Sequence, residues 1–399
     1  MLNGCGGSDD DTHRLPSTPF NVGSNRTINN DPCVVQETLE EKRSSGLANT
    51  LNSADINGGQ LTETGRIDSS ERYLYAPSLM YDAQEGLYKF WACGDDNGDH
   101  IIFKSSSSLA GLNTEPWQLA LEPSSNNSAF DHTHACDPSL IQAGNDMYLY
   151  YGGFNDDELF PTTRIGVAKS TNGGRTFRKL HEGRAIVQIE TESREGYGIG
   201  QPAVTYNPND RYYYMIYTHI NCSGNLGECN TRYIKVIKSL DPGFGLGTQE
   251  LVKSFNPDII GSYSVDLAYD EASHQFVIIG NQDRSSGIEV MLLYLDSDFN
   301  ILTRHYYNTD IANDISINTN INTNINDEPI ETATEQLTSF RFGEGIAVLK
   351  TPQGAIHKIR QESEIVFAGA TYNDNPQCPL PDHIAGPSRF ATFTEHTDI

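Results

Sequence analysis

The segment Cys136-Asp-Pro-Ser-Leu-Ile141 is one of four similar segments that decide the fold of this 399-residue chain. Each segment reads as a short apolar strand, and most of the segments begin with a dipeptide such as Pro-Ser. A turn and then an aromatic strand follow each segment. The other three are Tyr75-Ala-Pro-Ser-Leu-Met-Tyr81, Gly200-Gln-Pro-Ala-Val-Thr-Tyr206 and Val265-Asp-Leu-Ala-Tyr269. Aligned at Ala76, Asp137, Gln201 and Asp266, they recur every 61 to 65 residues. A near-constant period indicates a repeat architecture.

Each repeat consists of several short strands. An aromatic second strand such as Met147-Tyr-Leu-Tyr-Tyr151 precedes a third strand, and Asn172-Gly-Gly174 supplies the positive φ of a hairpin to a fourth. A weaker fifth match is Glu344-Gly-Ile-Ala-Val348, displaced by an Asn-rich insertion over residues 311–329. The sequence therefore predicts an all-β fold, a single five-bladed β-propeller with four-stranded antiparallel blades.

The predicted domain organisation is a tether and a propeller. We expect residues 1–30 to be a disordered tether and residues 31–399 to form the propeller, closed by the terminal segments. The expected blades cover about residues 72–120, 134–190, 198–255, 263–305 and 338–372. Leu2-Asn-Gly-Cys5 resembles the end of a bacterial lipobox, and the alternative is a coincidental cysteine. The expected localisation is exported, as a lipoprotein of the outer membrane or cell surface or as a periplasmic or secreted form.

The seven cysteines fit an oxidising compartment if Cys5 carries lipid, because an even number then remains. Cys222 and Cys229 flank a short loop, Cys93 ends the second strand of the first blade, and Cys136 begins the next blade. We predict three disulfides, which are Cys93–Cys136, Cys222–Cys229 and Cys33–Cys378.

The charge of the chain limits its partners. The formal net charge is −26. This weighs against nucleic acids and anionic membranes as partners, because a protein binds both through basic patches. No uninterrupted apolar run is long enough to span a bilayer. We expect a monomer whose acidity serves mainly to solvate the surface.

Three carboxylates are the first candidates for chemistry. The first strands of propeller blades surround the axis, so Asp137, Asp266 and Glu344 are expected close together. Because these carboxylates would repel one another, at least one of them should have a raised pKa or bind a cation. Two such carboxyl groups are the requirement of glycoside hydrolysis. The alternative for each is a hydrogen bond to backbone amides between blades.

The motifs resemble the five-bladed propeller glycoside hydrolases of families 43, 32, 62, 68 and 117 and related uncharacterised bacterial lipoproteins. The resemblance covers about residues 71–300. It rests on the tyrosine-rich second strands and on Ala76-Pro-Ser, Cys136-Asp-Pro-Ser-Leu, Arg164-Ile-Gly-Val-Ala-Lys-Ser and Tyr197-Gly-Ile-Gly-Gln-Pro-Ala. It implies an Asp base or nucleophile on blade one, an Asp on blade two that orients the sugar, and a Glu acid on blade three. Asp137 matches the second of these, whereas Ala76 and Gln201 replace the other two carboxylates.

Nearby residues complete the predicted site. Glu195 is a candidate for a displaced acid, on the loop that leads into blade three. The predicted substrate-binding residues are Asp99, His100, His134, Gln201, Tyr75, Trp91 and Tyr197. No cofactor is required and no zinc-type spacing is present, although a structural Ca²⁺ near the axis, with oxygen ligands such as Asp137 and Asp266, is one alternative.

Two functions from different classes follow. The first is an exported glycoside hydrolase-like protein that acts on a poly- or oligosaccharide through carboxylates in the axial cup. The alternative is a non-catalytic carbohydrate-binding propeller at the cell surface, favoured by Ala76 and Gln201. Both need a carbohydrate partner. A third possibility is a structural cell-surface propeller that binds another protein.

Overall fold

The structure is a computed structural model. It describes residues 55–67, 73–95, 99–158, 162–187, 195–222, 231–256, 265–284, 287–308, 340–359, 364–373 and 389–395. The predicted tether, Cys33, Cys229 and Cys378 lie outside these residues.

The fold is an all-β propeller with four-stranded antiparallel blades, as predicted. Blade one contains β2 (Tyr73–Asp82), β3 (Leu87–Asp95), β4 (Asp99–Ser106) and β5 (Gln118–Leu121). Blade two contains β6 (His134–Ala143), β7 (Asp146–Phe154), β8 (Arg164–Ser170) and β9 (Arg178–Lys179). Blade three contains β10 (Glu195–Asn207), β11 (Tyr212–Cys222), β12 (Thr231–Ser239) and β13 (Glu250–Phe255). Blade four contains β14 (Val265–Asp270), β15 (Gln275–Arg284), β16 (Gly287–Leu295) and β17 (Ile301–Asn308). The two short 3₁₀ helices of the described residues are η2 (Ala110–Asn113) and η3 (His181–Gly183).

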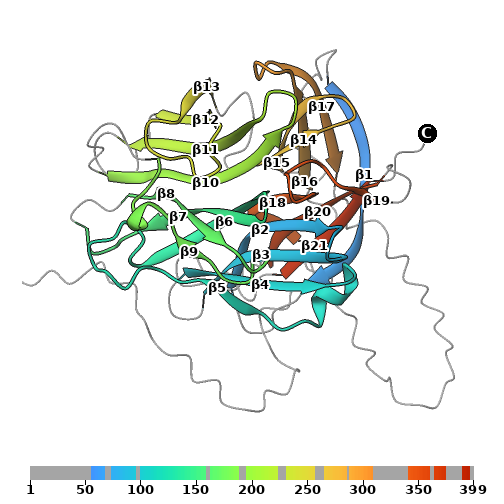
Figure 1. The fold of residues 1–399 in the computed structure, drawn as a ribbon. Helices are drawn as coiled ribbons and strands as arrows, with labels where there is room; N and C mark the ends of the chain where they lie inside the picture. Colours follow the sequence, from blue (N-terminus) through green and yellow to red (C-terminus); the bar gives the residue numbers. More distant parts are fainter. Residues whose placement is uncertain are drawn as a thin grey trace, which may run out of the picture.

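The remaining strands form a closing strip rather than a separate fifth blade. The strip contains β18 (Phe340–Lys350), β20 (Glu364–Asn373), β21 (Arg389–Glu395) and β1 (Asp55–Ile67), with β19 (Lys358–Ile359) beside β20. At its edges β18 pairs parallel to β2 and β1 pairs parallel to β17, so the strip joins blades one and four in one 13-stranded sheet. Figure 1 shows β1 running along this edge. The structure therefore has four blades and the prediction of five was wrong, because β18 and β20 continue into strands from both ends of the chain.

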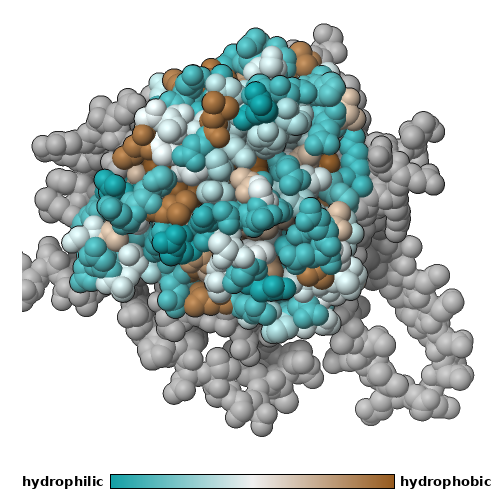
Figure 2. Space-filling view, viewed as in Figure 1, coloured by the Kyte–Doolittle hydropathy of each residue, from teal (hydrophilic) through white to brown (hydrophobic). Residues whose placement is uncertain are grey.

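The hydrophobic core lies between the blades. The first strands of the four blades and of the strip, β2, β6, β10, β14 and β18, contact one another in a closed ring. Aromatic and aliphatic side chains from facing sheets fill the spaces, with Trp91 and Tyr151 between blades one and two, and Tyr214 and Phe276 between blades three and four. Each fully buried large side chain stabilises the fold by roughly 1.5–3 kcal/mol. The face seen in Figure 2 is mainly hydrophilic, with small separate apolar patches.

The loop over residues 351–356 closes one end of this ring. Backbone carbonyls of Pro352, Gln353 and Gly354 accept hydrogen bonds from the backbone N–H groups of Gln142, Tyr206 and Tyr269, at 2.7, 3.1 and 3.2 Å. These three acceptors therefore tie β6, β10 and β14 together where each approaches its hairpin turn. We call this the hairpin end. The residues Ala76, Asp137 and Gln201 lie away from this end of their strands.

Candidate functional site

A β-bulge with left-handed backbone marks the opposite end of the first strands. The ladder register is interrupted between Tyr75 and Ser78, between Cys136 and Ser139, between Gly200 and Ala203, and between Phe342 and Ile346. Inside these interruptions φ is positive at Ala76 (48°), Asp137 (53°), Gln201 (53°) and Gly345 (102°). Non-glycine residues rarely adopt such φ, and bulges re-aim side chains next to functional sites. We call this the bulge end.

The hairpin turns fix which residues are equivalent. Asp82, Asn207 and Thr351 each stand in a hairpin turn, six positions after the bulge residues Ala76, Gln201 and Gly345 respectively. The side chain of each accepts a hydrogen bond from a backbone N–H group of its own turn. Asp270 does the same in blade four. Six positions before Asp270 stands residue 264, outside the described residues, so Asp266 is two positions beyond the bulge site. The ladder from Val265 to Asp270 is accordingly regular.

Asp266 makes an inter-blade contact. Its carboxylate is buried, with Lys350 Nζ at 2.5 Å. It also accepts from the backbone N–H groups of Leu267 at 2.8 Å and Val348 at 3.1 Å. Ser139 is at the equivalent position in blade two, and its Oγ accepts from Val204 N of the next first strand at 3.0 Å. The geometry therefore favours the alternative of a backbone tie for Asp266. With an ammonium group so close, the residue is a poor ligand for Ca²⁺.

Gly345, not Glu344, is the bulge residue of β18. A Cβ atom at Gly345 would lie 2.8 Å from Ala76 Cα, so the bulges of β18 and β2 touch and leave no room for a side chain. The alignment on Glu344 was therefore one residue early. The side chain of Glu344 lies outside the described residues, as do those of Asp99, Glu195 and Tyr197.

Asp137 is the carboxylate carried by a bulge in the described part of the chain. It is half-buried and lies over Gly152, where a Cβ atom would be 3.1 Å from its Oδ2. The methyl group of Thr163 is 3.5 Å from the same point. Thr163 in turn meets the start of β10, because its backbone bridges Gly198 and its carbonyl accepts from Ile199 N at 2.9 Å. The segment that carries Glu195 and Tyr197 therefore leads directly into the part of β10 that meets Thr163.

Two histidines precede Asp137. The Nε2 atom of His134 lies 3.1 Å from Asp156 Oδ2, and its ring packs against Phe154 at 5.6 Å. The Nε2 atom of His132 lies 3.6 Å from Asp157. Their imidazoles thus pair with the loop that follows β7. This contact holds that loop beside β6.

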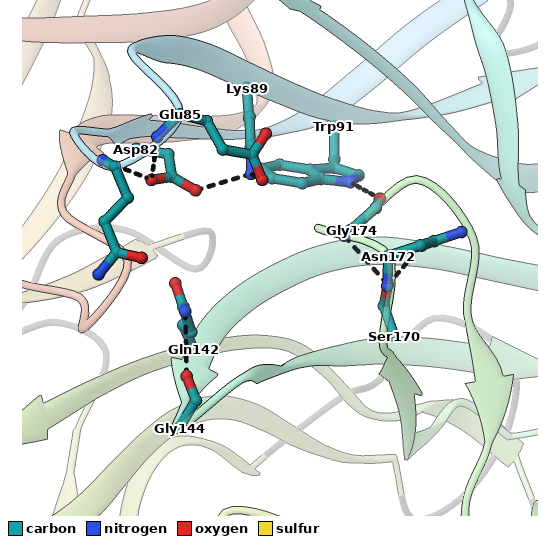
Figure 3. Close-up of polar contacts among 10 residues, drawn as sticks. Asp82, Glu85, Lys89, Trp91, Gln142, Gly144, Ser170, Asn172 and Gly174 are labelled. Atoms are coloured by element: carbon teal, nitrogen blue, oxygen red, sulfur yellow. Dashed lines mark hydrogen bonds and ion pairs between the residues drawn. The ribbon is translucent and has the colours of Figure 1, made fainter.

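The other predicted binding residues differ in burial, because some are half-buried and Trp91 is fully buried. Gln201 accepts a hydrogen bond from Thr218 Oγ1 at 3.3 Å and is half-buried, as are Tyr75 and His100. Trp91 is fully buried, and its indole N–H donates to Gly174 O at 2.8 Å. Figure 3 shows this contact between blade one and the turn after β8. Trp91 is therefore a core residue that cannot stack on a sugar.

The disulfide Cys93–Cys136 joins blades one and two next to Asp137, as predicted. Both cysteines are buried. Cys93 pairs with Tyr75 on β2, and Cys136 precedes Asp137 on β6. The bond therefore links two bulges across the blade boundary. The Cys222–Cys229 and Cys33–Cys378 pairings involve residues outside the described ones.

The sequence did not indicate the hairpin-end loop. Gly354 has φ of 83°, and a Cβ atom there would lie 2.8 Å from Thr205 Cα. The turn-forming sequence Thr351-Pro-Gln-Gly354 is the one signal that could have identified this loop.

No protein-family model and no curated protein matches the chain. Among solved structures, the neighbours are β-propeller glycoside hydrolases. The catalytic domain of a Coprinopsis cinerea family 62 α-L-arabinofuranosidase has a TM-score of 0.53 at 10% identity, covering 85% of this chain and 98% of that one. A Zobellia galactanivorans family 117 glycoside hydrolase has a TM-score of 0.52 at 11% identity, covering 85% and 92%. A Lactobacillus gasseri sucrose-6-phosphate hydrolase has a TM-score of 0.53 at 14% identity, covering 83% of this chain and 60% of that one. The chain likewise spans 60% of a Bombyx mori β-fructofuranosidase. Likeness at this identity establishes the fold.

Two features are absent from the described residues. No helix among them is long and apolar enough to cross a membrane. No group of three or more His, Cys, Asp or Glu side chains among them is arranged to hold a metal ion.

Proposed function

We propose that this protein is a glycoside hydrolase-like propeller that acts on a poly- or oligosaccharide at the bulge end of the first strands. The observation that carries the proposal is Asp137, a half-buried carboxylate on a left-handed bulge, supported by Gly152 and locked to blade one through the Cys136 disulfide. Strained backbone held by its surroundings is typical of functional sites. The structural neighbours are consistent with a glycosidase.

Hydrolysis needs a second carboxyl group, because one must donate a proton to the leaving oxygen while another acts as base or nucleophile. We assign the acid to Glu195, which stands three residues before the point where β10 bridges Thr163. Asp137 orients the sugar or acts as the base. Glu344 is a further candidate from β18, next to the bulge that touches Ala76. We do not assign catalysis to Asp266, whose carboxylate is neutralised by Lys350.

Substrate contacts are proposed for the remaining residues of this end. Tyr75 precedes the bulge residue Ala76, Gln201 is itself a bulge residue, and His134 lies three residues before Asp137. His100 and Asp99 start β4, and Tyr197 accompanies Glu195 on β10. Aromatic faces with a few polar groups are the usual lining of a sugar site.

The alternative is a non-catalytic carbohydrate-binding propeller. The other bulge residues of the described chain are Ala76, Gln201 and Gly345, none of which carries a carboxylate. Binding needs only the shape and hydrogen bonds of this end.

We further propose export and anchoring through a lipid on Cys5. The disulfide between Cys93 and Cys136 fits an oxidising compartment. We retain a monomer as the expected oligomeric state.

The deciding experiment compares wild type with Asp137→Asn on plant and algal polysaccharides, measuring released reducing ends and binding. Asp298→Asn, in an exposed turn, is the matched control. For a hydrolase, Asp137→Asn should lower turnover by about 10²–10⁴-fold. For a binding protein, neither form turns over and only Asp137→Asn binds more weakly. Unchanged turnover and unchanged binding would refute the site.

A further inference from the structure

Three tyrosines from two blades gather at the hairpin end, away from the proposed site. Tyr148 lies on β7, Tyr206 on β10 and Tyr213 on β11. Tyr206 and Tyr213 are directly paired across their strands, with ring centroids 4.9 Å apart at an interplanar angle of 42°. All three rings are half-buried and pack on the core between blades two and three. We call them the tyrosine platform.

The hydroxyl groups of the platform differ from those of the buried tyrosines. Tyr150, Tyr151 and Tyr214 each donate to a protein oxygen, which is Pro242 O, Asp131 Oδ2 and Asp210 Oδ2 respectively. Among the described residues, no protein group hydrogen-bonds the hydroxyls of the platform, and none of these oxygens is a buried unsatisfied atom. They are therefore accessible to solvent. Amphipathic rings with wet hydroxyls are typical of binding surfaces.

Charged groups beside the platform affect which ligand charge it can accept. Asp146 and Lys169 form an ion pair of 3.1 Å, and both are partly exposed. Burial raises the pKa of the Tyr148 hydroxyl; Lys169 opposes this, and Asp146 and Asp241 add to it, so the pKa is raised overall and the hydroxyl stays protonated as a donor. Lys169 balances the charge of Asp146, so Asp241 and the net charge of −26 are what disfavour an anionic ligand here.

We infer that Tyr148, Tyr206 and Tyr213 form a second carbohydrate-binding surface, which holds a neutral polysaccharide chain against blades two and three. The inference rests on the proposed function in that the ligand is a carbohydrate. Tyr206 follows Gln201 by five residues on β10, which places the platform about 16 Å along the strand from the bulge end. The surface therefore tethers the protein to polymer independently of Asp137.

The test is affinity electrophoresis of the intact protein in native gels that contain linear arabinan, inulin or a β-glucan. Wild type should be retarded by at least one of these neutral polymers. The Tyr206→Ala and Tyr213→Ala variants should bind that polymer about tenfold more weakly. Tyr206→Phe/Tyr213→Phe keeps the rings and the packing, so it should fold normally and weaken binding a few-fold. Tyr212→Ala, a neighbour on the same strand that packs towards blade four instead, is the matched control and should migrate as wild type.

Asp137→Asn separates this inference from the proposed function. It should retain the platform-dependent retardation while turnover falls. Wild type that no polymer retards, or folded tyrosine variants retarded as strongly as wild type, would overturn the inference. If retardation instead disappears in Asp137→Asn and persists in the tyrosine variants, the bulge end alone binds the polymer and the platform is only packing.

Discussion

Replacing Lys350 with methionine should destabilise the fold strongly. Lys350 Nζ lies 2.5 Å from Asp266 Oδ1, with the two side chains 3% and 7% exposed. Lys350→Met would leave a buried carboxylate with only the backbone N–H groups of Leu267 and Val348. Removing one partner of a buried pair costs about 3–5 kcal/mol. The equilibrium constant for unfolding should therefore rise by roughly 10²–10³-fold or more, at about 1.4 kcal/mol per tenfold.

The assay is urea unfolding followed by tryptophan fluorescence. The double variant Asp266→Ser/Lys350→Met reproduces the joint between blades two and three, where Ser139 accepts from the next strand. It should recover most of the lost free energy of unfolding, because replacing both members of a buried pair is often neutral. Glu182→Gln breaks an exposed pair with Arg184 and should change the free energy of unfolding by less than about 1 kcal/mol. A single variant as stable as wild type, or a double variant no better than the single, would refute the structural assignment of Asp266.

Three further predictions concern other joints. Gly354→Ala should destabilise the protein by about 1–3 kcal/mol in urea, because its φ is 83° and its Cβ would meet Thr205; an unchanged midpoint would contradict the role of the closing loop. Replacing Cys93 and Cys136 together by alanine should lower the free energy of unfolding by about 2–5 kcal/mol, and equal stability of oxidised and alanine forms would argue against the bond. Burial lowers the pKa of His357 below its ordinary value of 6.5, so the unfolded chain binds a proton more readily and stability should fall as the pH drops below 6.5. His357→Gln should flatten that part of the stability profile measured by urea unfolding, and an equally steep profile would show that other groups cause the loss.

The repeats in the sequence predicted the blades because each blade is built from consecutive strands. The Cys93–Cys136 bond followed from the same reasoning, since one cysteine ends a second strand and the other begins the next blade. The closing strip carried only the weaker match at Glu344–Val348, which lies in β18. Its outer strand β1 comes from near the N-terminus, while β18, β20 and β21 come from the C-terminal part, so no period in the sequence joins them.

The candidate site was predicted only in part. The alignment placed Asp137 at its bulge position because Pro138 and the strand after it match the pattern closely. Asp266 and Glu344 were aligned at the head of a short apolar strand, but the position of a bulge within such a strand is not revealed by matching residue types. The Asx-type turns at Asp82, Asn207 and Asp270 carry the correct register, and counting back from them would have placed Asp266 between blades.

The most direct test of the central claim is a crystal structure of the Asp137→Asn variant with an oligosaccharide that wild type binds or hydrolyses. We predict a sugar ring at the bulge end, with a hydroxyl or ring oxygen within hydrogen-bonding distance of residue 137 and the start of β10 beside it. An oligosaccharide bound elsewhere on the propeller, with residue 137 free of any sugar contact, would contradict the claim.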